Sequence, residues 1–306
     1  MQIVLKLFLL SIVLPILIWS HSIKPLPETV SLDKDKVALG KKLFMDPILS
    51  KDKSIACVSC HDLLNGGDDG MKFSIGIDGK MGDINAPTVY NSSHNFRQFW
   101  DGRAKSLEEQ ALGPIENPLE MGATLELVLK RLKKDSYYEK EFNRLYKNGI
   151  TIESLTDAIS TFEQALITPN SPFDRYLKGD KSALNQKEKR GYEIFKSKGC
   201  IICHQGMSIG GNLYNKFGIY EDINLTHLGR FNVTHREDDK YVFKVPSLRN
   251  IALTAPYMHD GRAETLEEAV RLMTKHQLGR HITEEEMEAL VSFLNTLTGI
   301  IPAIAK

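Results

Sequence analysis

Every cysteine of this chain belongs to one of two copies of a single short motif. The sequence reads C-V-S-C-H at residues 57–61 and C-I-I-C-H at residues 200–204, and these copies contain all 4 cysteines. The pattern C-x-x-C-H is the attachment site of haem c, in which two thiols bond to the haem vinyl groups and the histidine ligates the iron. The sequence therefore predicts two covalently bound haems c. The residues predicted to hold them are Cys57, Cys60 and His61 in the first half, and Cys200, Cys203 and His204 in the second.

Two other uses of paired cysteines explain the pattern less well. A structural zinc ion needs four ligands in a closed tetrahedral arrangement. A redox-active dithiol needs neither a following histidine nor a second copy of the motif. Haem attachment accounts for both copies and for both histidines.

The first 22 residues have the composition of a secretory signal peptide. Lys6 supplies a positive charge, residues 7–19 form an apolar stretch with Ser11 as its one polar residue, and Ser20-His21-Ser22 offers small residues at a cleavage site. The stretch is too short for a comfortable membrane span, and an uncleaved N-terminal anchor is the alternative. Either way, the rest of the chain is expected in the bacterial periplasm, where haem c is attached.

The balance of charge excludes one class of partner. The 39 lysines and arginines equal the 39 aspartates and glutamates in number. The short basic stretches at 130–134 and 187–190 fit solvated helix faces. Nucleic acid is therefore not expected as a partner.

The chain contains an internal duplication. The sequence P-T-V-Y-N at 87–91 corresponds to P-S-L-R-N at 246–250, and D-G-R-A-K-S-L-E-E at 101–109 corresponds to D-G-R-A-E-T-L-E-E at 260–268. Each half is therefore predicted to be one cytochrome c-like haem domain. The predicted domains are an N-terminal domain over residues 23–175 and a C-terminal domain over residues 176–306.

Apolar spacing and capping residues predict a mainly α-helical fold with long irregular loops. Ser106 and Thr265 each precede Leu-Glu-Glu, which is typical of an N-cap followed by acids in the first turn. The Gly- and Asn-rich loops at 65–85 and 206–250 fit a core that is built around haem. Helices are predicted over residues 33–44, 124–132, 152–166, 186–196 and 283–297.

The two halves differ where a haem iron would take its sixth ligand. A strong protein ligand there suits a haem to electron transfer, whereas an open position lets the iron bind an oxidant. In the second half Met273 offers a thioether, and Met207 and Met258 compete for the same role. The corresponding position in the first half holds Pro114, which cannot ligate iron. The first haem is therefore predicted to be the reactive one.

Three residues of the first half are candidates for peroxide chemistry. A carboxylate near an open iron can take a proton from hydrogen peroxide and return it to the leaving oxygen, and Glu120 is the candidate for this role. Gln110 can orient the peroxide by hydrogen bonding. Trp100, directly before the repeated Asp-Gly-Arg, is a candidate electron relay, and His259 occupies its position in the second half.

These residues carry a resemblance to a known family. The segments at 86–91, 99–104, 107–110, 117–122 and 254–261 resemble the bacterial dihaem cytochrome c peroxidases. The resemblance implies reduction of hydrogen peroxide to water, with electrons from a small cytochrome c or cupredoxin. It implies that the first haem is the low-potential peroxidatic site, and that electrons enter at the high-potential second haem, which Met273 ligates.

The resemblance also implies a calcium ion at the domain interface and a homodimer. The calcium ligands carry over to Asn85, Thr254 and Pro256, the last two through backbone carbonyls. Oxygen ligands supplemented by water suit calcium.

One position departs from the family pattern. Many members carry a histidine after Ser-Ile-Gly in the loop beyond the first haem, and this histidine caps the iron in the oxidised enzyme. Ile77 stands there in this chain and cannot ligate iron. The first haem is therefore predicted to be open even when fully oxidised, without reductive activation. The alternative caps are Met71, Met81 and His94.

Two other functions remain open. A MauG-like enzyme uses the same scaffold to oxidise a partner protein, but a tyrosine replaces the methionine at its second haem. A non-enzymatic dihaem carrier or redox sensor needs two six-coordinate irons, and it leaves Glu120 and Gln110 without a role. The peroxidase is the prediction that uses all of these residues.

Overall fold

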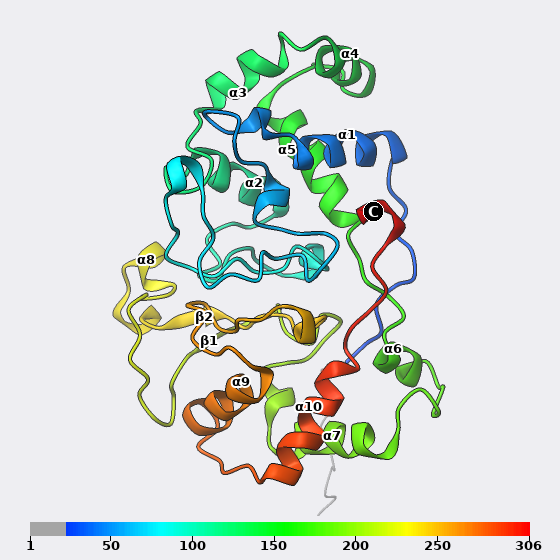
Figure 1. Cartoon of the computed structure of the whole chain (residues 1–306), viewed down its shortest axis with the longest axis vertical. Helices are drawn as coiled ribbons and strands as arrows, with labels where there is room; N and C mark the ends of the chain where they lie inside the picture. Colours follow the sequence, from blue (N-terminus) through cyan, green and yellow to red (C-terminus); the bar gives the residue numbers. More distant parts are fainter. Residues whose placement is uncertain (1–22) are drawn as a thin grey trace, which may run out of the picture.

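The structure, a computed structural model, describes residues 23–306, and the predicted signal peptide lies outside them. Helices and irregular loops make up nearly all of these residues, and the two halves lie one above the other in Figure 1. The prediction of a mainly α-helical fold with long irregular loops is confirmed. Within the described residues, no helix is long and apolar enough to cross a membrane.

A packed pair of helices forms the centre of the first half. α1 (Lys34–Met45) packs on α5 (Ile152–Gln164), and α2 (Leu107–Glu116) packs on α5 as well. The close approach of α1 to α5 requires a glycine, because a Cβ atom on Gly40 would lie 1.9 Å from the carbonyl oxygen of Ala158.

The second half repeats this helix pair, as the duplication predicts. α7 (Gln186–Ser197) packs on α10 (Glu284–Asn295), and a Cβ atom on Gly191 would lie 1.9 Å from the carbonyl oxygen of Ala289. The two contacts fix a common register for α5 and α10. Residues of α5 correspond to residues 131 positions later in α10, as Ala158 does to Ala289.

The remaining elements are short. Two helices cover the far end of the first half, one lies in the link between the halves, and the others belong to the second half (Figure 1). Two strands pair antiparallel in the long loop that follows the second haem motif. The elements are α3 (Leu125–Leu132), α4 (Ser136–Leu145), α6 (Pro172–Leu177), β1 (Tyr214–Lys216), α8 (Phe231–Thr234), β2 (Val242–Lys244) and α9 (Leu266–Leu272).

All five predicted helices are present, and Ser106 and Thr265 cap α2 and α9 as predicted. The last helix ends at Asn295 rather than at residue 297. The sequence did not predict α4, because only Tyr138 and Phe142 mark its buried face. The strands were missed because three residues are too few for alternation to show.

Corresponding asparagines from the two halves meet at the link between them. Asn91 and Asn250 both adopt left-handed backbone conformations, with φ of 61° and 60°. Their side-chain amides donate hydrogen bonds of 2.8 Å and 2.9 Å to the hydroxyl of Thr168, which is 1% exposed. One linker residue, Thr168, therefore accepts hydrogen bonds from the corresponding asparagines of both halves.

The two ends of the described chain cross between the halves (Figure 1). Ile23 belongs to the apolar cluster of the second half, and the backbone N–H of Leu26 donates a hydrogen bond of 3.2 Å to Asp174. At the other end, Ala305 packs in the cluster that contains Phe44 of α1. The boundary between the two predicted domains, after residue 175, stays a prediction.

Candidate active site

The first haem motif lies on a cavity of the first half. Cys57, Cys60 and His61 line this cavity together with Gln110 and Glu120. The structure thus brings the predicted acid–base group and its helper to the predicted first haem. The other lining residues are Phe44, Ile55, Ala56, Ala111, Pro114, Ile115, Met121, Ile159 and Glu163.

The motif histidines suit axial ligation of iron. Nδ1 of His61 lies 3.1 Å from the carbonyl oxygen of Gly67, and with Nδ1 as the donor, Nε2 remains free for a metal. Burial lowers the pKa of His61, and it lowers the pKa of His204 to about 4. Both rings are therefore held neutral, which is the form that binds metal.

The four thiols fit thioether bonds better than a zinc site. None of them forms a disulfide. Burial raises the pKa of Cys57 to about 12 and that of Cys200 to about 11, so both thiols are protonated in the metal-free protein. Among residues 23–306, no three His, Cys, Asp or Glu side chains gather as a metal site. The donor set therefore fits haem c at both motifs.

Glu120 is a partly buried carboxyl group in the turn that follows α2. The side-chain amide of Asn117 donates a hydrogen bond of 2.6 Å to its Oε1 atom. Burial raises the pKa of Glu120, and the Asn117 hydrogen bond and the charge of Arg103 partly offset this effect. A pKa nearer to neutral pH suits a group that must both take and return a proton.

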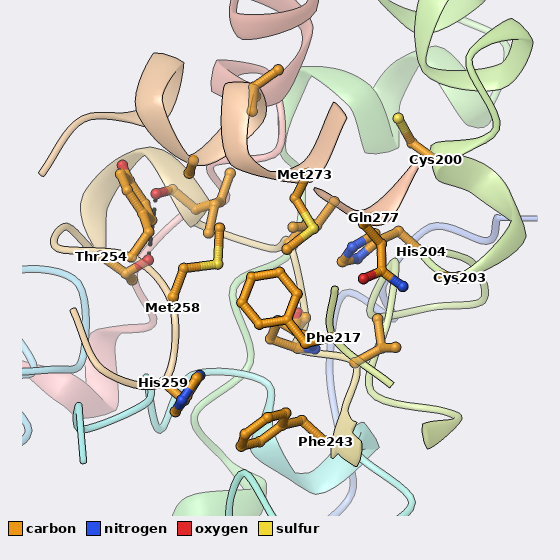
Figure 2. Close-up of a pocket in the computed structure, with 18 of the residues that line it drawn as sticks. Cys200, Cys203, His204, Phe217, Phe243, Thr254, Met258, His259, Met273 and Gln277 are labelled. Atoms are coloured by element: carbon orange, nitrogen blue, oxygen red, sulfur yellow. Dashed lines mark hydrogen bonds between the residues drawn. The ribbon is translucent and has the colours of Figure 1, made fainter. Parts of the chain in front are cut away.

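Corresponding positions of the two halves line corresponding cavities. Pro114 lines the first cavity, and Met273 lines the second together with His204. Met273 begins a π-helical turn that continues α9 to Gln277, and such turns recur at functional sites. Figure 2 shows Met273 and Met258 in the same cavity. Met207 is not among the lining residues, so Met273 and Met258 remain the candidates for the sixth ligand.

Sequence reasoning missed a buried lysine in the second cavity. Lys244 in β2 is 5% exposed and lines the cavity, and burial lowers its pKa to about 8. Nearby, His259 stacks on Phe243 at 4.2 Å, and its Nε2 atom is buried without a hydrogen-bond partner (Figure 2). Buried charges and polar atoms require partners. The carboxylates of a haem would satisfy both groups, so the cavity fits that cofactor.

Trp100 lies where the two halves meet. Its indole N–H donates a hydrogen bond of 2.9 Å to the carbonyl oxygen of Asn85, and its own carbonyl oxygen accepts one of 2.8 Å from the N–H of Lys244. Its ring centroid lies 6.2 Å from that of His259. Trp100 therefore contacts groups of both halves and lines the second cavity.

The three residues predicted to bind calcium lie on the wall of the cavity that Trp100 also lines. Asn85, Thr254 and Pro256 all line the second cavity. The Asn85 side-chain nitrogen donates a hydrogen bond of 2.9 Å to the carbonyl oxygen of Met71. This leaves the side-chain oxygen of Asn85 available to a cation. The oxygen atoms fit calcium, and the calcium site stays a prediction.

Ile77 lies in a loop that packs on the turn carrying Glu120. It is 2% exposed, and its N–H donates a hydrogen bond of 2.8 Å to the carbonyl oxygen of Glu120. A Cβ atom on Gly76 would lie 2.0 Å from the carbonyl oxygen of Leu119, so the loop and the turn are in direct contact. Within the described chain, the first cavity is not lined by any of the alternative caps Met71, Met81 and His94.

Glu163 is a second functional candidate that sequence reasoning missed. It lies in an apolar helix pattern, and no motif marks it. The only sequence signal comes from aligning the two halves of the duplication. The position of α10 that corresponds to Glu163 holds the apolar Leu294.

Comparison with known proteins agrees with this geometry. Residues 34–182 match the family model of di-haem cytochrome c peroxidases, and residues 188–298 match that of cytochrome c. The chain is 48% identical over 286 residues to the cytochrome c551 peroxidase of Nitrosomonas europaea, covering 92% of this chain and 86% of that protein. The chain belongs to the di-haem cytochrome c peroxidase family.

Other members of the family show the same relationship. The cytochrome c peroxidase Ccp of Escherichia coli (strain K12) is 46% identical over 287 residues, which cover 92% of this chain but only 62% of that protein's length. A solved MauG-like protein associated with microbial copper homeostasis is 28% identical, with a TM-score of 0.78, and the match covers 94% of this chain and 95% of that one. The family models and the similar proteins confirm the predictions of the family, of the enzyme class and of two haems c.

Proposed function

We propose that this di-haem cytochrome c peroxidase reduces hydrogen peroxide to two waters in the periplasm, with electrons from a small cytochrome c or cupredoxin. The observation that carries the proposal is the shared cavity of His61, Gln110 and Glu120, with Pro114 where the other half has Met273. Peroxide reduction requires an open position at the iron and an acid–base group beside it.

In the proposed reaction, one residue of this chain transfers a proton and another orients the peroxide. The haem, when bound, supplies the redox chemistry that breaks the O–O bond. The Glu120 carboxylate accepts a proton from one peroxide oxygen and returns it to the other, which then leaves as water. The Gln110 amide orients the peroxide by hydrogen bonding. The apolar walls of the cavity exclude bulk water and strengthen these polar contacts.

Electrons are proposed to enter at the second haem, in the C-terminal domain, and to reach the N-terminal domain past Trp100. A methionine ligand such as Met273 raises the potential of a haem, which suits a haem that accepts electrons from the donor. The hydrogen bonds of Trp100 to Asn85 and Lys244 support a relay at this position. The calcium ion at Asn85, Thr254 and Pro256 and a homodimeric assembly belong to the same proposal.

The role of Glu120 is tested by the Glu120→Gln variant. We expect peroxide turnover to fall by about 10²–10⁴-fold, the usual contribution of general acid–base catalysis, with both haems still attached. Full activity would refute the assigned role. Inactivity of the unaltered holoprotein with every donor would instead favour a partner-oxidising enzyme or a carrier.

The open first haem is tested by the order of addition. Fully oxidised holoprotein receives hydrogen peroxide first and reduced cytochrome c last, and donor oxidation is followed from mixing. Because Ile77 cannot cap the iron, we expect donor oxidation without a lag. A lag that pre-reduction abolishes would mean that another residue caps the iron.

A further inference from the structure

A buried carboxyl group beside the first haem motif has no part in the chemistry above. Glu163, near the end of α5, is 5% exposed and lines the cavity of His61 and Glu120. Its Oε2 atom is buried without a hydrogen-bond partner. A carboxylate in such a place is unfavourable unless a positive charge or a proton compensates it.

A second carboxyl group links this position to the surface. Glu108 on α2 is partly exposed, and its Oε1 atom accepts a hydrogen bond of 2.5 Å from the hydroxyl of Ser160 on α5. The side-chain amide of Gln164 donates a hydrogen bond of 3.0 Å to the same hydroxyl. Glu108 thus lies against the last turn of α5, from which Glu163 enters the cavity.

The elements around Glu163 supply few charges. Burial, followed by the negative charge of Glu108, raises the pKa of Glu163 to about 8. The negative charge of Glu163 in turn raises the pKa of Cys57, after the larger effect of burial, and both side chains line the same cavity. The remaining titratable groups on the cavity wall are Cys60, His61 and Glu120, and α1 contributes the apolar Phe44.

The second half of the molecule lacks this arrangement. In the shared register of α5 and α10, Leu294 corresponds to Glu163 and Val291 corresponds to Ser160. Leu294 is 5% exposed and lines the second cavity, as Glu163 lines the first. The carboxyl group therefore distinguishes the half that would bind peroxide from the half that would only transfer electrons.

We propose that Glu163 and Glu108 form a redox-linked proton site of the first haem. When one electron from the reduced donor arrives at that haem, one proton from solvent passes Glu108 and forms an O–H bond with the Glu163 carboxylate. When the haem is oxidised again, this bond breaks. With peroxide present, the proton passes to a peroxide oxygen in the same cavity; without peroxide, it returns to solvent past Glu108. Two such cycles supply the two electrons and two protons that reduction of hydrogen peroxide to two waters consumes.

The proposal rests on haem attachment at the first motif and does not require peroxide turnover. The test is a potentiometric titration of both haems in peroxide-free holoprotein over a range of pH. If one proton is taken up with each electron, the midpoint potential falls by about 59 mV per pH unit. This is the potential that corresponds to a tenfold change in proton concentration for a one-electron couple. We expect this slope at the first haem around neutral pH.

Two substitutions of Glu163 remove the proton site without adding charge. Glu163→Gln keeps the shape, and Glu163→Leu copies the second half. Both are expected to abolish the slope at the first haem and to leave the profile of the second haem unchanged. An unchanged slope in Glu163→Gln would overturn the proposal, because the proton would then reside on another group, such as Glu120.

Glu108→Gln supplies an independent measurement. Loss of its negative charge lowers the pKa of Glu163, so the sloping region is expected to move to lower pH but to persist. An infrared difference spectrum of reduction should also contain a protonated-carboxyl band that Glu163→Gln lacks. A sloping region that stays in place in Glu108→Gln would refute the pairing of the two carboxyl groups. Peroxide turnover can fail in a separate assay without affecting any of these results.

Discussion

The hydrogen bond from Asn117 favours the charged form of Glu120. If Glu120 acts as a base, kcat/KM rises as pH passes the pKa of its carboxyl group. Asn117→Asp removes the donor but keeps the oxygen that accepts the backbone N–H of Leu119, and Asn117→Ala removes both. A hydrogen bond to a charged group contributes about 1.5–3 kcal/mol. We therefore expect the acid limb of the kcat/KM profile to move up by about one pH unit or more.

Both Asn117 variants should reach the plateau of the unaltered enzyme at high pH, since the reaction itself is unchanged. The added negative charge makes the shift larger in Asn117→Asp than in Asn117→Ala. A limb that stays in place in both variants would mean that a group other than Glu120 titrates there.

Met273 and Met258 both offer a thioether to the second haem. Met273→Leu keeps the size of the side chain and removes the sulfur. If Met273 is the sixth ligand, this variant should lower the potential of the second haem, because methionine ligation raises it. Spectroelectrochemical titration measures the effect, and Met258→Leu is the matched control from the same cavity. The reverse pattern would assign the ligand to Met258.

Residues whose chemistry follows from type and spacing could be predicted from the sequence. The first haem motif, Glu120 and Gln110 line one cavity, as the sequence implied. Glu163 and Lys244 could not be predicted, because their significance depends on burial. A glutamate near the end of a helix and a lysine in a three-residue strand are ordinary surface residues until tertiary packing encloses them.

At the scale of helices, Gly40 determines how closely α1 approaches α5. Gly40→Ala would force the two helices apart, and overpacking of a close contact costs about 1–3 kcal/mol. We expect thermal unfolding of the holoprotein at a lower temperature. Ala38→Ser also adds one heavy atom to α1, but on its exposed face, and it should leave the unfolding temperature nearly unchanged. Equal stability of Gly40→Ala and Ala38→Ser would contradict the packing argument.

Helix existence was easier to predict than the loops between helices. Capping residues and apolar periodicity are local signals, and they located α1, α5, α7 and α10. The contact of the loop at residues 73–81 with the Glu120 turn depends on segments distant in sequence. Local patterns contain no information about such a contact.

At the scale of the whole molecule, Thr168 joins the halves through one hydroxyl. Thr168→Val keeps the shape but removes the acceptor from the buried amides of Asn91 and Asn250. A buried polar group without a partner costs about 1–3 kcal/mol, so the unfolding temperature should fall clearly. Thr168→Ser retains the hydroxyl and should preserve most of the stability. Similar losses in both variants would mean that packing of the methyl group matters more than the hydrogen bonds.

The crossed ends of the chain limit how the molecule can be divided. A single cut in the linker would separate Ile23 from the apolar cluster of the second half that it helps to fill, and Ala305 from the neighbours of Phe44. Neither fragment would then be a self-sufficient haem module. A deletion of the last few residues, although made at the tail of the second half, should damage the first. Fusion tags should therefore be attached through flexible spacers. A transplant of one half into another protein would also have to include the terminal segment of the other half that packs on it.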